Sequence, residues 1–248
     1  MAKAKAKEAK PLPFGHKLVL NQWIVSLFGF DPLKDHKDDK RTLRPMSPIA
    51  STVKDAPEGM NAENLHHFYR ELDIHLQKGS QLTREDLLRY EHNIVSHTLA
   101  INEKRQRPII WKYYQWLSLL FAEIYLDRFF ADRDALHEQL NAYVDSFNDY
   151  WTQAGYVTGI TSYAVEDLNK LCLQNATGSG KTLLMHVNFL QFRHYAEASP
   201  LKDDLTRTIL ITPNESLSEQ HRKEMKSSDI VAERLLTDSG DLLSTGKN

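Results

Sequence analysis

The sequence predicts an α-helical N-terminal region followed by the beginning of an α/β unit with an incomplete parallel sheet. Proline is common in residues 1–57, whereas Gly79 and Pro108 are the only Gly and Pro between residues 60 and 154, which leaves long stretches for helices. After residue 156 the pattern changes to strand, loop, helix, strand, loop and helix, the order of a parallel α/β unit. We therefore expect a helical region over residues 1–160 and an α/β region over residues 161–248.

The composition is that of an ordinary globular protein. The chain has 248 residues, of which 41% are hydrophobic and 26% charged, and its formal net charge is −2 at pH 7. This length suffices for a buried core, and the charge shows no basic excess that would by itself indicate nucleic acid. Cys172 is the one cysteine, so an internal disulfide is excluded, and its place in an expected strand predicts a buried, inert thiol.

Two apolar stretches are long enough to consider as membrane segments, and neither has the required character. Residues 18–30 are too short to cross a bilayer. Residues 109–130 are longer, but Lys112, Glu123 and Asp127 recur through them, as on a helix with one wet side. The basic start MAKAKAKEAK is not followed by the apolar stretch of a signal peptide, so we expect a solvated tail. These features predict a cytoplasmic protein that does not contact a membrane.

Apolar side chains at helical spacing predict two helices between residues 61 and 107. The first has Asn61 as its N-cap and ends at Gly79. The second opens with Thr83 and Asp86 in the pattern of a capping box. It ends before Pro108, because proline disfavours a helical conformation in the residue that precedes it.

Two further helices and two strands complete the expected order. One helix covers residues 109–130, and the next carries an apolar stripe that stops at Gly155. The run LNKLCLQ at residues 168–174 and the β-branched run TILIT at residues 208–212 are expected to be strands, each followed by a loop and a helix. Two strands cannot form a stable parallel sheet by themselves. The sequence therefore predicts only the opening part of an α/β domain.

The stretch NATGSGKT is a candidate phosphate-binding loop between the first strand and a helix. Gly178 and Gly180 let the backbone turn so that its N–H groups point at a polyphosphate, at the positive end of the helix dipole. Lys181 is expected to reach the β- and γ-phosphates, and the Thr182 hydroxyl to complete the coordination of Mg²⁺. Asn175 stands where the loose pattern usually has Gly or Ala. The predicted site for a nucleoside triphosphate consists of Ala176, Thr177, Gly178, Ser179, Gly180, Lys181 and Thr182, with Lys181 as its catalytic residue.

The segments ATGSGKT, TILIT and TPNESLSEQ resemble motifs I and Ia of superfamily 2 helicases and translocases. Within that group they are most similar to DEAD/DEAH-box proteins of the restriction-enzyme R-subunit type. The resemblance implies a motor driven by ATP and Mg²⁺, with two RecA-like lobes, that moves on or separates nucleic acid. Residues 161–248 would begin the first lobe. Motif Ia lies against the phosphate backbone of one strand, a role that carries over to Pro213, Asn214 and Ser216.

The helical region also resembles a family pattern. The run WKYYQWLSLLFAEIYLDRFF ahead of ATGSGKT is similar to the N-terminal extension of large bacterial helicases associated with restriction and phage defence. Motif Ia implies DNA as a partner of the full-length parent, and the similarity to defence-associated helicases implies restriction or defence-system subunits as further partners.

Two departures from the helicase pattern affect the expected activity. No DExH or DExD sequence follows motif Ia, and Asp238-Ser239-Gly240-Asp241 has no apolar strand before it. The second lobe, with its arginine finger, is also missing from the sequence. We therefore expect the N-terminal piece of a longer helicase, which does not hydrolyse ATP by itself.

Two other classes of function remain open. One is a different P-loop enzyme, such as a kinase or an AAA-type remodeller, although the motif Ia loop TPNESLSEQ counts against it. The other is a helical interaction module that carries a vestigial, inactive P-loop. Such a module would show no change on addition of nucleotide.

Overall fold

The computed structural model describes residues 10–33, 47–205 and 207–234, and this part of the chain is mostly helical. The N-terminal elements are β1 (Lys10–Pro11), the short 3-10 helix η1 (Phe14–His16), α1 (Val19–Leu27), α2 (Ser47–Val53) and α3 (His67–Ile74). The three longest helices follow, namely α4 (Arg84–Asn102), α5 (Tyr113–Ala131) and α6 (Arg133–Gln153). The C-terminal elements are β2 (Tyr156–Val157), the 3-10 helix η2 (Val165–Asn169), α7 (Lys181–Ala198) and α8 (Glu215–Ser227).

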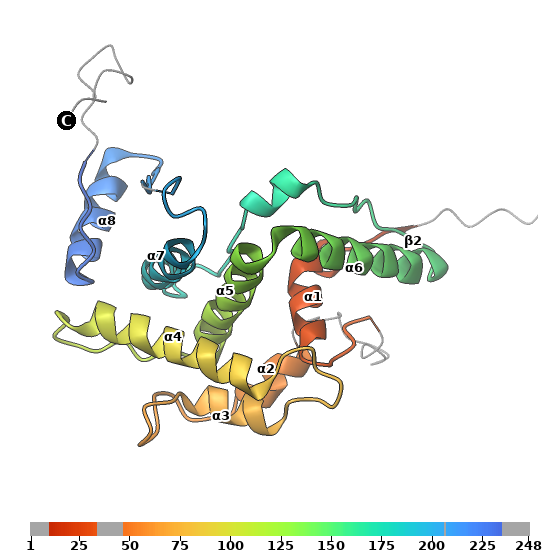
Figure 1. Ribbon diagram of the computed structural model, residues 1–248, viewed down its shortest axis with the longest axis horizontal. Coiled ribbons are helices and arrows are strands. Elements are labelled where there is room, and N and C mark those ends of the chain that lie inside the picture. Colours follow the sequence, from red (N-terminus) through yellow and green to blue (C-terminus); the bar gives the residue numbers. More distant parts are fainter. Residues whose placement is uncertain (1–9, 34–46, 206, 235–248) are drawn as a thin grey trace, which may run out of the picture.

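Helix α5 lies at the centre of the molecule. It packs against α1, α2, α4, α6 and α7, and Figure 1 shows it between α4 on one side and α6 on the other. Its side chains Trp116, Leu119 and Ile124 are completely buried in the main hydrophobic core. The same core includes Leu184 and Val187 from α7. The helix that follows the candidate loop is thus packed into the helical core.

The charged residues of α5 do not form the solvent-exposed face that the sequence predicted. Glu123 is completely buried, where it accepts hydrogen bonds from Tyr195 of α7 at 2.6 Å and from Asn93 of α4 at 3.1 Å. Asp127, close to the surface, pairs with Arg89 at 2.9 Å. The expectation failed for Glu123 because α7 covers that face of α5. None of the described helices combines the length and apolar character that a membrane crossing requires.

Several predicted helix ends are confirmed. Thr83 and Asp86 form the expected capping box at the start of α4, with the Asp86 amide donating to the Thr83 hydroxyl at 3.0 Å. Helix α6 ends at Gln153, with Ala154 as its C-cap, and the following Gly155 adopts a left-handed backbone conformation with φ of 84°. Helices α7 and α8 also lie where the spacing predicted them.

Other predicted ends are wrong by several residues. The N-cap of α3 is His66, because Asn61 instead accepts hydrogen bonds from the amides of Glu63 and Leu65 and closes a separate turn. The same helix ends at Ile74, before Gly79. Helix α5 begins at Tyr113 rather than at residue 109.

The expected strands on either side of the candidate loop are absent from the described residues. Residues 165–169 form η2, and the rest of LNKLCLQ has no regular structure, so Cys172 is exposed rather than buried in a strand. The run TILIT is likewise irregular. A strand needs a neighbour to pair its N–H and C=O groups, and none lies beside either run in the described structure.

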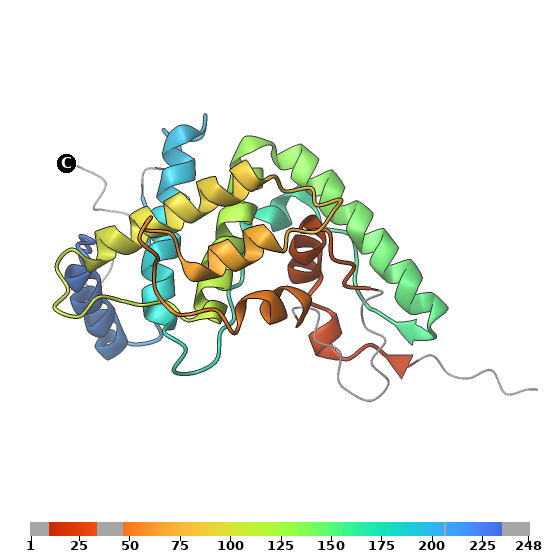
Figure 2. The same cartoon turned by 90° about the horizontal axis from the view of Figure 1, so that it is seen from below.

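A small parallel sheet is present in a different place. Lys10 of β1 pairs with Tyr156 of β2, and Pro11 pairs with Val157. Figure 2 shows the two short strands beside the far end of α6. The sheet therefore ties the beginning of the described chain to the segment that follows α6, at a distance from the candidate loop.

Candidate functional site

The candidate loop makes a tight turn and leads directly into α7. The amide of Ser179 donates to the carbonyl oxygen of Ala176 at 3.2 Å, which closes the turn. Gly178 and Gly180 have φ of 76° and 80°, in the left-handed region that glycine adopts without steric cost. Gly180 is the N-cap of α7, and Lys181 is its first residue. The structure thus brings Ala176–Thr182 together as one loop and helix start.

This helix start offers donors for an anion. The amides of Lys181 and Thr182 belong to the first turn of α7, whose N–H groups have no acceptors within the helix. The helix dipole adds a partial positive charge at the same end. The exposed Lys181 donates from Nζ to the carbonyl oxygen of Asn175 at 3.2 Å, so its ammonium group lies back over the loop. These groups together favour the binding of a phosphate.

A pocket of about 280 Å³ lies against the loop. The lining residues are Tyr114, Asn175, Ala176, Thr177, Gly178 and Ser179. The hydroxyl oxygen of Ser179 is buried and has no hydrogen-bond partner among the described residues. A buried hydroxyl without a partner is costly, so the loop carries an unsatisfied polar group beside the pocket. The donor set and the pocket therefore fit a polyphosphate.

The loop is held from α5. Gln115 donates from Nε2 to the carbonyl oxygen of Ser179 at 2.8 Å, and its Oε1 accepts from the amide of Lys112 at 2.9 Å. The preceding residue, Tyr114, lines the pocket. The sequence reasoning missed both residues because they precede the loop by more than sixty positions and lie in a run that predicts only a core helix.

Helix α7 is fixed on the core by polar contacts as well as by its buried leucine and valine. Gln191 donates to the carbonyl oxygen of Leu119 at 3.0 Å, and Tyr195 donates to the carboxylate of Glu123. Burial raises the pKa of Glu123 above its ordinary value, against the lowering effect of the hydrogen bonds from Tyr195 and Asn93. The loop therefore leads into a helix whose position is well determined.

The residues predicted to contact nucleic acid lie at the start of α8. Pro213, Asn214 and Ser216 are all exposed. The side chain of Asn214 accepts from the amide of Leu217 at 2.9 Å and caps the helix. Ser216 and the other residues of the first turn of α8 lie at an exposed helix N-terminus. The three residues thus lie where a second loop enters α8, separate from the candidate loop at residues 176–182.

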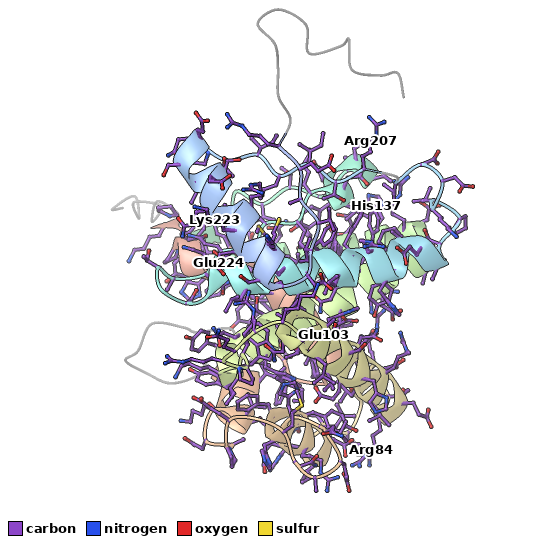
Figure 3. The ribbon with its side chains drawn as sticks, turned by 90° about the vertical axis from the view of Figure 1, so that its left-hand side faces the viewer. Arg84, Glu103, His137, Arg207, Lys223 and Glu224 are labelled. Atoms are coloured by element: carbon purple, nitrogen blue, oxygen red, sulfur yellow. The ribbon has the colours of Figure 1, made fainter. Side chains whose placement is uncertain are left out.

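The far end of α8 is anchored on α4 and α7. The Ser228 hydroxyl, just beyond α8, accepts from Arg105 at 2.6 Å and lies 2.8 Å from Nδ1 of His186 on α7. Arg105 also lies 3.7 Å from the carboxylate of Glu224. Figure 3 shows Glu224 on α8 and Glu103 at the end of α4 on this side of the molecule. His186 is completely buried at this junction.

Residues 133–239 match the family model of the type III restriction enzyme, res subunit. The res-subunit match begins with α6 and includes both the candidate loop and the loop before α8. The resemblance to the restriction-enzyme R-subunit type is therefore confirmed over these residues, which are less than half of the chain. No curated protein and no solved structure matches the chain.

Two residues of the candidate site lie outside the range that matches the res-subunit family. Tyr114 and Gln115 precede residue 133, yet they line the pocket and hold the loop. Asp238 and Asp241 lie outside the described residues. Within the described residues, the side chains that line the pocket include no carboxylate, and no group of His, Cys, Asp or Glu is arranged to hold a metal ion. A metal ion at this site would depend on the phosphates and on Thr182.

Proposed function

We propose that residues 176–182 bind ATP together with Mg²⁺, as the ATP-binding part of a DNA helicase or translocase of a restriction or phage-defence system. The observation that carries the proposal is the turn at Gly178 and Gly180 that opens directly into the N-terminus of α7. A loop of this kind with a following lysine is a phosphate site on physical grounds. The res-subunit match supports the assignment to this class of motor.

Each loop residue has a role in the proposed site. The amides of Gly180, Lys181 and Thr182 would bind phosphate oxygens, and the Lys181 ammonium would neutralise the β- and γ-phosphates. Thr182, which is half-buried at the start of α7, would bind Mg²⁺ through its hydroxyl. Bound ATP would supply the phosphoanhydride bond whose hydrolysis drives movement. Because no carboxylate lines the pocket among the described residues, we expect the 248-residue chain to bind ATP without appreciable turnover.

The nucleotide site is tested by replacing Lys181 with alanine. We expect Lys181→Ala to weaken the binding of ATP and Mg²⁺ by about a hundredfold, as measured by isothermal titration calorimetry, because a charge-assisted contact to phosphate is lost. Lys170→Ala is a matched control, since Lys170 is exposed shortly before the loop and its ammonium group pairs with the exposed Asp167. Equal affinity in wild type and Lys181→Ala would contradict the assignment. Failure of the wild type to bind ATP would favour the vestigial-loop alternative.

The proposed contact with DNA rests on the second loop. The exposed Ser216 hydroxyl and the free amides at the N-terminus of α8 would bind backbone phosphates, which position a strand without reading its sequence. Binding of duplex oligonucleotides should therefore fall steeply with salt, and Ser216→Ala should weaken different sequences equally. Asn214 is a poor target because its side chain caps α8. Loss of binding to one sequence alone would show that the loop reads bases.

A further inference from the structure

We propose that Gln115 is a positioning residue for the nucleotide-binding loop, and that through it the helical core and the nucleotide stabilise each other. The inference rests on the proposed function, because it concerns the same loop. Gln115 lies at the N-terminus of α5, outside the residues that match the res-subunit family. Its contact with Ser179 joins positions 64 residues apart in the sequence.

Both ends of the Gln115 amide are used. Nε2 donates to the Ser179 carbonyl oxygen at 2.8 Å, while Oε1 accepts from the Lys112 amide at 2.9 Å. Reversing the amide would point Oε1 at the Ser179 carbonyl oxygen and Nε2 at the Lys112 N–H, so that neither hydrogen bond could form. The hydrogen bonds with Lys112 and with Ser179 therefore fix one orientation of the Gln115 amide.

The contact controls the direction of a loop amide. The Ser179 carbonyl and the Gly180 N–H belong to one planar, trans peptide unit, so they point in opposite directions. Holding the carbonyl toward α5 directs the Gly180 N–H away from it, where it is available to an anion. Gly180 also gives Gln115 the space for this approach, because a Cβ on residue 180 would lie 2.6 Å from Nε2 of Gln115. Gln115 and Gly180 thus depend on each other.

The support for Gln115 is rigid. Trp116, the next residue, is completely buried and donates from Nε1 to the carboxylate of Glu91 at 2.9 Å. The stretch from residue 170 to residue 176, by contrast, has no regular structure. The position of the loop is therefore determined by its attachment to α5 and α7, in the place where the sequence predicted support from a strand.

Coupling follows from this arrangement. If Gln115 holds the loop in the conformation that binds phosphate, loss of its donor lowers the population of that conformation and weakens nucleotide binding. Conversely, bound nucleotide must stabilise the contact between Gln115 and Ser179, since such coupling is reciprocal. One hydrogen bond of this kind corresponds to a change of about three- to tenfold in affinity.

The first test separates the two roles of the Gln115 side chain, which caps α5 through the Lys112 amide and contacts the loop through the Ser179 carbonyl oxygen. Gln115→Glu keeps an oxygen acceptor for the Lys112 amide, and glutamate is an ordinary partner in a capping box, so α5 stays capped. The ionised carboxylate cannot donate to Ser179, whereas the protonated acid can. We expect ATP and Mg²⁺ to bind about three- to tenfold more weakly at pH 8, by calorimetry, with the difference from wild type shrinking only as pH falls toward about 4.3, where a glutamate side chain takes up its proton.

Two further variants control for charge and for general destabilisation. Gln115→Met keeps the length of the side chain without a charge, and it should lose affinity to the same extent at every pH. Gln139→Glu introduces the same change on the exposed side of α6, where Gln139 accepts from Arg128, and should leave affinity unchanged. A pH-independent effect of Gln115→Glu, or wild-type affinity in both Gln115 variants, would overturn the proposal.

A second measurement needs no nucleotide. Cys172 is exposed, lies shortly before the loop and is the one cysteine of the chain, so a nitroxide spin label can be attached to it without other changes. We expect Gln115→Met to increase the mobility of this label and Gln139→Glu to leave it unchanged. If wild type binds no ATP, the proposed function fails and the label still shows whether Gln115 holds the loop. If wild type binds ATP and neither readout responds to Gln115, the inference fails and the function stands.

Discussion

Helix α5 and residues 208–212 are both apolar runs in the sequence, but the structure treats them in opposite ways. In α5, Trp116, Leu119 and Ile124 are completely buried. In the run TILIT, Ile209 is 74% exposed and Ile211 is 87% exposed. A helix pairs its backbone groups within itself and needs a partner only for its apolar face, whereas a strand needs a neighbour for its backbone as well. Burial here therefore depends on the neighbours of a segment as much as on its composition.

The largest expected difference between the two regions comes from the same substitution made in each. Ile124→Ala should lower the free energy of unfolding by about 2–5 kcal/mol, because it opens a cavity in the core around α5. Ile211→Ala should change it by less than about 0.5 kcal/mol, because the side chain is exposed. Urea denaturation of both variants provides the comparison. A cost above about 2 kcal/mol for Ile211→Ala would show that TILIT is a buried strand, as the sequence suggests.

The same comparison explains which features could be predicted from the sequence. The Thr83–Asp86 capping box and the glycine after α6 depend on neighbouring residues, and both were predicted correctly. The turn at Gly178 and Gly180 and the start of α7 are also local, and the sequence predicted both. The hold of Gln115 on Ser179 and the burial of Glu123 under α7 depend on contacts between distant segments. No spacing rule reveals such contacts. The predictions of strands at residues 168–174 and 208–212 were wrong for the same reason, because a strand depends on a neighbour that is distant in the sequence.

The attachment of α7 and α8 to the core should weaken in acid. Burial, followed by the positive charges of Arg105 and His221, lowers the pKa of His186 to about 4. Between about pH 6.5 and pH 4 the unfolded chain therefore binds a proton that the folded chain does not, so stability falls as pH falls, by up to about 1.4 kcal/mol per pH unit. Burial also lowers the pKa of His97 to about 4, which adds a second contribution of the same sign.

Replacing His186 should remove its share of this pH dependence. His186→Asn can keep a polar contact with Ser228 but cannot take up a proton in this range. We expect the fall in unfolding free energy between pH 7 and pH 5 to become smaller, as measured by urea denaturation at both pH values. His75→Asn is the control, because His75 is exposed on α3. An unchanged pH dependence in His186→Asn would show that folding does not lower the pKa of His186.

The smallest expected effect concerns two buried glutamates that differ in their partners. Glu91 accepts hydrogen bonds on both oxygens, from His66 and from Trp116. Glu123, where α7 meets α4 and α5, has its Oε2 paired with Tyr195 and Asn93, while its Oε1 has no partner among the described residues. A buried charge with incomplete hydrogen bonding is costly, and this cost raises the pKa of Glu123.

Glu123→Gln should therefore stabilise the protein at neutral pH, by about 1 kcal/mol, because it removes the charge and keeps an oxygen for Tyr195 and Asn93. The sign of the pH dependence follows from the raised pKa. The folded protein holds the Glu123 proton to a higher pH than the unfolded chain does, so the wild type loses stability as pH rises through that range. The gain in stability from Glu123→Gln should be present at pH 7 and shrink as pH falls toward 4.5.

Glu91→Gln should instead destabilise the protein, since its new NH₂ group would face the donors of His66 or Trp116. Destabilisation by Glu123→Gln at pH 7 would mean that the ionised carboxylate is needed where α7 joins the core.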